Sequence, residues 1–299
     1  MFKHEDLIRA ASKVAQSDGD YETAIPGLWV YRRSTPTEPM PCIYGLGLGI
    51  TAQGSKRVLL SDEVIDYGVG QSLITSLDLP VVAQVRRASL SEPYIGIRLD
   101  LDARSIAEVA ARMPSSKTNI AAATRAVSVA VLEEGEVDAM TRLISLLGEP
   151  HLIESLAPLI QKEIVVRLLN GAHGAVLRQL IAAGAPGEQF SHLMGWLKDH
   201  YTEDVSIDEL AVMAHMSPST FRQHFRTLTG TSPLQYLKQL RLQEAKQIML
   251  NEDLDAAMAA MRVGYESASQ FSREYSRLFG APPYRDVQRT KKMQQSLVA

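Results

Sequence analysis

The sequence has few of the residues on which several protein classes depend. It contains one cysteine, Cys42, among 299 residues, which excludes an intrachain disulfide framework and a cysteine-based zinc cluster. No stretch approaches the roughly 18 unbroken apolar residues that a membrane-spanning helix requires. The N-terminus, MFKHED, is charged where a signal peptide has its apolar segment. We therefore expect a cytoplasmic protein without a membrane partner.

Histidine is also scarce in the first third of the chain, where His4 is the only one between Met1 and Arg104. Metalloenzymes with a β-barrel usually bind their metal through two or three histidines and a carboxylate. A Ser-His-Asp hydrolase likewise needs a histidine beside its serine. We therefore expect no catalytic residue, no metal and no cofactor.

Net charge gives little information about partners. The chain carries a formal charge of −3, and the stretch from Trp196 to Lys292 has 13 Lys and Arg against 12 Asp and Glu. This balance argues against a general polyanion binder, so local placement of charge has to indicate any nucleic-acid surface. The length favours two domains.

A repeat of fifty residues lies in the C-terminal third. Six of seven aligned pairs are identical, and the seventh pairs two aromatic residues. The pairs are Ser217 with Ser267, Ser219 with Ser269, Phe221 with Phe271, Phe225 with Tyr275, Leu228 with Leu278, Gly230 with Gly280, and Pro233 with Pro283.

Each copy predicts two short helices joined by a tight turn. In the first copy, Ser206 and Glu209 form a capping-box pattern, Ser217 and Pro218 begin a second helix, and Gly230 ends it. The second copy has the same order. Two such units are typical of a helix-turn-helix protein.

One long helix is predicted between the copies, from Pro233 to Met249. It would hold the two recognition helices at a fixed separation. They could then enter successive major grooves on one face of DNA, about 34 Å apart.

The faces opposite the apolar stripes carry arginine and glutamine, which bind guanine and adenine edges in the major groove. Such residues on an isolated helix usually serve only solvation, but here the same cationic face occurs in both copies. Ala268 could touch only a thymine methyl group. The expected DNA-reading residues are Ser219, Thr220, Arg222, Gln223 and Arg226 in the first helix, and Ala268, Ser269, Gln270, Arg273 and Arg277 in the second.

These motifs resemble the double helix-turn-helix domain of the AraC family of bacterial regulators. The resemblance covers about Phe190 to Gln288 and is carried by SPSTFRQHFRTLTGTSPLQYLKQLRLQEAKQIML and VGYESASQFSREYSRLFGAPPYRD. It implies base contacts from most of the residues named above, and operator half-sites in double-stranded DNA as the partner. It also implies a homodimer, and RNA polymerase as a partner if the protein is an activator.

Short strand-like runs separated by turn residues fill the N-terminal part and predict a barrel or sandwich. Helical patterns follow. The expected strands are Leu28–Tyr31, Tyr44–Ala52, Arg57–Leu60, Gln71–Thr75, Val81–Arg86 and Tyr94–Leu101, and the expected helices are Ser105–Met113, Ala121–Leu132, Asp138–Leu147 and Glu154–Leu169.

This part is similar to the cupin-like N-terminal domain of one branch of the AraC family. The carriers are IPGLWVYR, PCIYGLGLGITAQGSKRVLL and GQSLITSLDLPVVAQV. The resemblance implies a small-molecule sensor, followed by helices that serve as linker and dimer contact.

Two effector classes remain open. Cys42 could sense aldehydes or oxidants as a thiolate, although a lone cysteine is more often a buried small hydrophobic residue. Alternatively, arginines such as Arg86 and Arg98 could bind an anion, for example a cyclic dinucleotide, or could merely solvate the barrel exterior. Replacing Cys42 by serine separates the two, because only the aldehyde response needs the thiol.

The sequence therefore predicts an α+β regulator with three parts. Residues 1–104 form a cupin-like β-barrel that senses an effector, residues 105–189 form a helical linker and dimerisation region, and residues 190–290 form an all-α double helix-turn-helix domain. The competing classes are a constitutive DNA-binding protein and a ligand-binding protein whose DNA module is idle.

Overall fold

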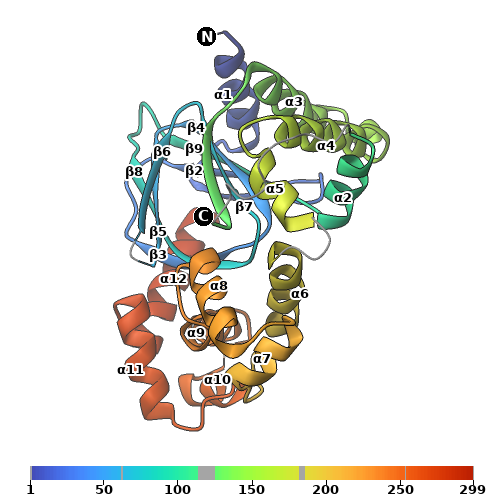
Figure 1. Ribbon diagram of the computed structural model, residues 1–299. Coiled ribbons are helices and arrows are strands. Elements are labelled where there is room, and N and C mark those ends of the chain that lie inside the picture. The colour runs from blue at the N-terminus through green and yellow to red at the C-terminus, as the bar shows by residue number, and fades with distance from the viewer. Residues whose placement is uncertain (1, 62, 114–124, 182–185, 253, 299) are drawn as a thin grey trace.

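The computed structural model describes residues 2–61, 63–113, 125–181, 186–252 and 254–298. An antiparallel β-domain with helices on one side occupies the N-terminal part, and a purely helical unit follows below it in Figure 1. This arrangement confirms the predicted fold class, an N-terminal β-structure followed by an all-α double helix-turn-helix.

Two antiparallel sheets form the β-domain. The six-stranded sheet has the order β1 (Gly19–Glu22), β2 (Leu28–Arg33), β9 (Tyr94–Asp100), β4 (Gly47–Gln53), β7 (Gln71–Thr75) and β10 (Val127–Val131). The four-stranded sheet has the order β3 (Met40–Tyr44), β8 (Leu79–Arg87), β5 (Ser55–Leu60) and β6 (Glu63–Gly68).

Side chains alternate between the two faces of each sheet. On one face of the six-stranded sheet, Val30, Ile97 and Ile50 lie opposite one another in register and are buried. Helix α1 (Phe2–Val14) contacts β4 and β9 and buries Leu7 and Ala11. The other face is turned toward the four-stranded sheet.

Helices cover the β-domain on the side of the six-stranded sheet that α1 contacts (Figure 1). They are α1, α2 (Ala103–Ala111), α3 (Glu134–Ser145), α4 (Ile153–Asn170) and α5 (Gly174–Ile181), with two short 3-10 turns, η2 (Leu146–Gly148) and η3 (Pro150–Leu152), between α3 and α4. No single helix among the described residues is long and apolar enough to cross a membrane. One pair, Glu134–Gly148 with Pro150–Asn170, meets the length and composition test only when joined across a bend of 118°.

The predicted helix at 121–132 is wrong over its described second half. Val127–Val131 is strand β10, which pairs antiparallel with β7 at the edge of the six-stranded sheet; residues 121–124 lie outside the described residues. The segment reads VSVAV, and β-branched valines that alternate with small residues favour a pleated conformation where a free sheet edge is available. The predicted strand Tyr44–Ala52 corresponds to β4 from Gly47 onward, whereas Tyr44 is the last residue of β3, which belongs to the other sheet. Helices α1 and α5 and strands β1, β3 and β6 were not predicted.

The C-terminal helices match the predicted repeat. They are α6 (Pro186–Asp199), α7 (Ile207–Met213), α8 (Pro218–Thr229), α9 (Pro233–Asn251), α10 (Ala256–Arg262), α11 (Ala268–Phe279) and α12 (Pro283–Val298). The first helix-turn-helix is α7–α8, the second is α10–α11, and α9 is the predicted long helix between them. Leu234, in the first turn of α9, is exposed.

The buried apolar side chains form two clusters that meet on α9. The first extends from Leu7 through both sheets to Phe225 and Leu240. The second begins at Leu242 and ends at Val287. The first helix-turn-helix unit therefore shares a continuous core with the β-domain, whereas the second unit has a core of its own.

A buried histidine joins the helices to the six-stranded sheet. His173 lies just before α5 and is 1% exposed. Its Nε2 is 2.8 Å from Ser72 Oγ on β7, and its Nδ1 is 3.1 Å from Ser128 Oγ on β10. A neutral imidazole has one donor and one acceptor nitrogen, so it satisfies both hydroxyls. Burial lowers the pKa of His173 to about 4.

This pKa predicts a pH dependence of stability. The unfolded chain binds a proton at His173 near pH 6.5, whereas the folded chain binds it only near pH 4, so the stabilisation is complete above pH 6.5. It is lost as the pH falls toward 4 and amounts to about 3 kcal/mol. Urea titrations between pH 7 and pH 4 measure this loss. His173→Gln removes that part of the pH dependence, and His192→Gln, at an exposed position on α6, leaves it intact. An unchanged pH profile in His173→Gln contradicts the assignment.

Candidate nucleic-acid interface and ligand cavity

Helix α8 has the local chemistry that the sequence predicted. The side chain of Ser217 accepts a hydrogen bond from the Thr220 backbone, Pro218 occupies the first turn, and Gly230 ends the helix in the left-handed region at φ +75°. Phe221 and Phe225 are fully buried, which turns the opposite face outward. The exposed residues are Ser219, Thr220, Arg222, Gln223 and Arg226.

Helix α11 repeats this arrangement, with Ser267 as N-cap and Gly280 as left-handed C-cap. Phe271 and Tyr275, the repeat partners of Phe221 and Phe225, are buried. Phe279 is also buried, whereas Leu278, the repeat partner of Leu228, is only half-buried. The exposed residues are Ala268, Ser269, Gln270, Arg273 and Arg277.

Glu274, for which the sequence suggested no role, links α11 to α9. Its carboxylate accepts hydrogen bonds from Lys238 Nζ at 2.9 Å and Tyr265 Oη at 2.8 Å. Gln270 Nε2 also donates to it, at 3.2 Å. Partial burial opposes ionisation, but these hydrogen bonds hold the pKa of Glu274 below its usual value. Glu274 is thus an ionised anchor, and Gln270 has an intramolecular partner in the unbound protein.

Arg241 in the middle of α9 connects both helix-turn-helix units. Its Nε donates to the Tyr201 carbonyl at 2.6 Å, and its Nη2 donates to the Glu203 carbonyl at 2.7 Å; both carbonyls lie ahead of α7. Its Nη1 donates to the Gly264 carbonyl, in the turn between α10 and α11, at 3.2 Å. One rigid guanidinium therefore fixes both units to the same turn of α9.

The backbones of the two units also touch directly. Gly264 has φ +84°, and a Cβ at this position would lie 2.6 Å from the Thr202 carbonyl oxygen. Only glycine allows both this conformation and this approach.

The second unit is further held by a buried ion pair. Asp286 on α12 is 1% exposed and lies 2.7 Å from Lys246 Nζ of α9. Tyr275 Oη of α11 donates to the same carboxylate at 2.9 Å. Three helices of this unit are therefore joined at one carboxylate.

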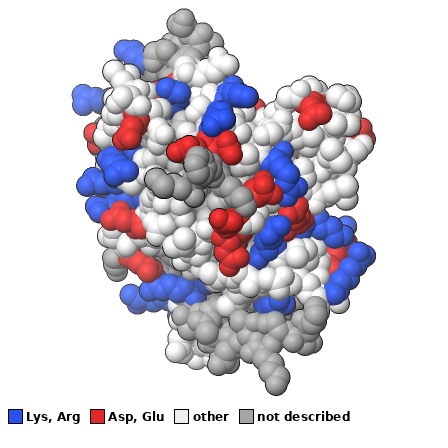
Figure 2. All heavy atoms as spheres, turned by 90° about the horizontal axis from the view of Figure 1, so that it is seen from above, with Lys and Arg blue, Asp and Glu red and all other residues white. Residues whose placement is uncertain are grey.

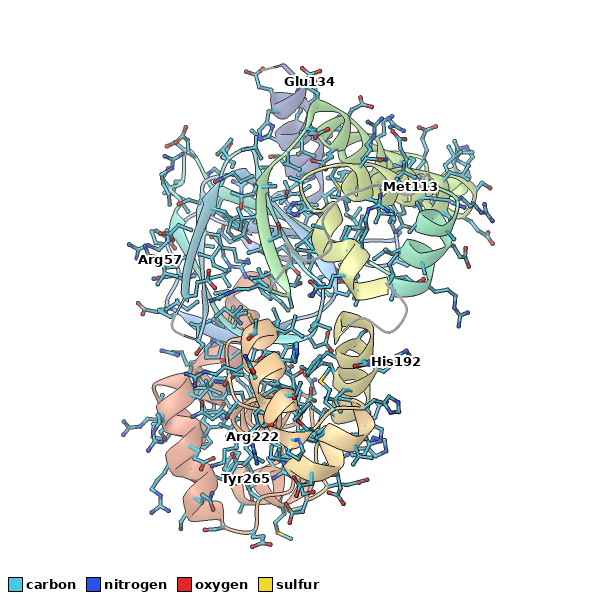
Figure 3. All side chains as sticks on the ribbon, in the orientation of Figure 1. Arg57, Met113, Glu134, His192, Arg222 and Tyr265 are labelled. Atoms are coloured by element: carbon cyan, nitrogen blue, oxygen red, sulfur yellow. The ribbon has the colours of Figure 1, made fainter. Side chains whose placement is uncertain are left out.

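Figure 2 views the molecule from above, on the side away from the helix-turn-helix units. Lys and Arg alternate with Asp and Glu over the described part of this face, without a continuous basic surface. In Figure 3, Arg222 lies at the opposite end of the molecule from Glu134. A nucleic-acid surface is therefore expected at the helix-turn-helix end.

A cavity of about 210 Å³ lies between the two sheets of the β-domain. The predicted effector residues Cys42 and Arg98 both line it, whereas Arg86 is exposed and lies outside its lining. Burial raises the pKa of the Cys42 thiol despite the nearby Lys56 and Arg98 charges. Cys42 is therefore protonated at neutral pH, which removes support for a thiolate sensor.

The sequence analysis did not identify Lys56 as a cavity residue, although the alternation in its strand indicates an inward position. In SKRVLL of β5, Val58 and Leu60 are buried and share a face with Lys56, while Arg57 points the other way. Figure 3 shows Arg57 at the outer side of the β-domain. A lysine at an otherwise apolar inward position costs free energy unless its charge is paired, so the alternation indicates Lys56 as a candidate binding residue.

Comparison with known proteins agrees with this architecture. A family model described as AraC-type transcriptional regulator N-terminus matches residues 24–176, and one described as helix-turn-helix domain matches residues 210–289. The RCS-specific HTH-type transcriptional activator RclR of Escherichia coli K12 is 36% identical over 123 residues, which are 41% of this chain and 37% of that protein. The HTH-type transcriptional activator RhaS of Escherichia fergusonii is 32% identical over 95 residues, 32% of this chain and 34% of that protein. The matched region is thus a little over a third of the length of these relatives.

A solved structure, apo ToxT from Vibrio cholerae strain SCE256, shares the fold over almost the whole chain. The TM-score is 0.60 at 9% sequence identity, covering 89% of this chain and 98% of that one.

The approach of Gly264 to Thr202 predicts the effect of a single methyl group. Gly264→Ala forces the turn of the second unit away from Thr202 and lowers the free energy of unfolding by about 2 kcal/mol. It also changes the separation of α8 and α11. Chemical denaturation measures the first effect. Gly148→Ala is the matched control, because a Cβ there meets nothing within 4 Å. Equal stability of the two variants would refute this account of the turn.

Proposed function

We propose, from the premise that this chain belongs to the AraC family of transcriptional regulators, that it binds specific double-stranded DNA sequences and regulates transcription in response to a small molecule. The two exposed, arginine-bearing faces of α8 and α11, joined by one long helix, carry this proposal. Each face can enter a major groove.

The proposed base-reading residues are those predicted from the sequence. Arg222 and Arg273 are exposed on the two recognition helices and make no described ion pair, so their guanidinium groups are available for guanine O6 and N7. Gln270 would have to exchange its bond to Glu274 for a base contact. Ser219 and Thr220 lie at the N-terminus of α8, where backbone N–H groups and hydroxyls suit phosphate contacts.

The proposed functions of the parts follow their order along the chain. Residues 1–104, with β10 added from the following segment, would sense the effector, and residues 190–290 would read DNA. The segment between them would link the parts and carry the dimer contact.

Strand β3 offers a route from the cavity to the DNA-reading helices. It lines the cavity with Cys42 and Tyr44, and it contacts both α9 and α11. It is also an edge strand, paired only with β8. An effector that displaces β3 would therefore act on α9 and α11 together.

The size of the cavity and the burial of Cys42 argue against both effector classes suggested by the sequence. Pockets for drug-sized ligands have volumes of about 300–1,000 Å³, so a cavity of about 210 Å³ is too small for a cyclic dinucleotide. The protonated state of Cys42 argues against a thiolate reaction. A compact ligand held without covalent chemistry is the better supported alternative.

Helix α4 supports the homodimer. Leu156, Leu159 and Val166 are exposed on it, at 37%, 63% and 37%. Leu159 lies three residues after Leu156, and Val166 lies seven residues after Leu159, so the three side chains share one face of the helix. The ion-paired Glu163 occupies the position between Leu159 and Val166. A second copy of the chain would bury this stripe. If the regulator is an activator, RNA polymerase is the further partner.

Replacing the two arginines tests DNA reading. Fragments selected from genomic DNA by the wild-type protein should show a discrete footprint with two major-groove segments per protomer. Arg222→Ala and Arg273→Ala should each weaken binding about tenfold or more and relax base preference in one segment, because each loses a bidentate guanine contact. Footprinting and competition binding measure both.

The matched control is Arg104→Ala, at an exposed position on α2, which should bind like the wild type. If no fragment is selected at moderate salt, and the arginine variants behave like the wild type, DNA reading by α8 and α11 is refuted.

A charge in the α4 stripe tests the dimer. Leu159→Glu places a carboxylate in the proposed apolar contact and should weaken self-association at least tenfold, measured by sedimentation velocity. Leu90→Glu is the control, because Leu90 is 85% exposed on a loop of the β-domain. A wild-type protein that is monomeric at tens of micromolar would exclude this dimer.

A further inference from the structure

We propose that the cavity in the β-domain binds a compact aromatic monocarboxylate, whose carboxylate is held by Lys56 and Tyr44. This inference deepens the proposed function and rests on it only for the regulatory consequence. The binding itself is a property of the β-domain.

Glycines in the six-stranded sheet create the space. Gly49 lies opposite Leu73 and Arg98 in register, so all three positions share the cavity face. A Cβ at Gly49 would meet nothing closer than 3.7 Å. The strand therefore omits a side chain where one is sterically allowed, which leaves the cavity open.

Most polar side chains around the cavity already have partners within the protein. Arg33 pairs with Asp20 at 2.5 Å, and Arg98 pairs with Asp100 at 2.6 Å. The side chains of Gln84 and Thr75 donate to backbone carbonyls. These groups are bound to other protein groups in the cavity wall and are therefore not free to bind a ligand.

Lys56 and Tyr44 are different. Tyr44 Oη is buried and has no hydrogen-bond partner among the described residues. Lys56 forms no ion pair in the described part of the chain, and its Nζ lies 5.2 Å from the centre of the Tyr44 ring. The cavity lining therefore holds a cation over the ring of a tyrosine whose hydroxyl is unsatisfied.

The charge balance favours a single carboxylate. Among the described residues, Asp20 is the only carboxylate in the lining, and Arg33 neutralises it. Lys56 therefore leaves this lining with one uncompensated positive charge. A carboxylate supplies one negative charge and can accept from both the ammonium and the hydroxyl. A phosphate would bring additional charge without a second free cation to balance it.

The remaining walls favour an aromatic body. Tyr31, Tyr67 and Tyr94 line the cavity together with Leu73 and Val85. Flat tyrosine faces pack well against an aromatic ring. An apolar cavity of about 150 Å³ can hold benzene, so about 210 Å³ accommodates a benzene ring with a short acidic substituent.

Thermal unfolding of the full chain tests the proposal with benzoate, phenylacetate and cinnamate, each compared with its uncharged amide. At saturating concentration, at least one acid should raise the Tm of the wild type by about 5 °C, and its amide should not. Lys56→Met should weaken binding of that acid at least tenfold, and Tyr44→Phe several-fold. Gly49→Val should prevent binding by filling the cavity.

Lys13→Met, on the exposed side of α1, is the matched control and should bind like the wild type. Equal stabilisation by acid and amide, unchanged binding in Lys56→Met, or no stabilisation by any of the three acids overturns the proposal. Footprinting on the same preparations separates the two claims. A discrete footprint without carboxylate binding refutes only the ligand class, whereas carboxylate binding without a footprint refutes only DNA reading.

Discussion

The arrangement of the DNA-reading end depends on the guanidinium of Arg241. It binds backbone carbonyls ahead of α7 and in the turn between α10 and α11, so one side chain on α9 sets the relation of two otherwise separate helix-turn-helix units. The contact between Gly264 and Thr202 brings the same segments together without any side chain between them. A long helix alone would fix only a distance, whereas these contacts also fix a rotation about α9. Two recognition helices that bind one face of DNA require a fixed distance and a fixed rotation.

The β-domain shares its core with the first unit and touches the second through β3. Leu228, at the end of α8, accepts a backbone hydrogen bond from Ala126 at 3.3 Å, and Lys198 lies 3.6 Å from Asp78. A change at the cavity can therefore reach α8 through packed side chains and α11 through an edge strand. Edge strands have one unpaired side and move at lower cost than central strands.

Local chemistry made the helical third predictable. Ser217, Ser267, Gly230 and Gly280 are caps whose effect depends on neighbouring residues only, and the fifty-residue repeat showed each signal twice. The alternating runs of the β-domain were also recognisable. Strand β10 was missed because its conformation depends on the free edge of β7, more than fifty residues earlier. The alternation in β5 indicates that Lys56 points inward, but the proposed carboxylate site was missed because Tyr44 comes from the non-adjacent strand β3 and the cavity forms only where the two sheets pack. The linking roles of Arg241 and Glu274 depend equally on distant segments.

The central claim is that α8 and α11 are held at one separation and one rotation. Binding to a selected operator whose two contacted segments are moved apart tests this most directly. Insertion of five base pairs turns one segment to the opposite face of the duplex, because a helical turn is about 10–10.5 base pairs. The account predicts that this insertion weakens binding at least a hundredfold, and that insertion of a full turn does not restore it, since the protein cannot lengthen. Unchanged affinity with either insertion would contradict the account.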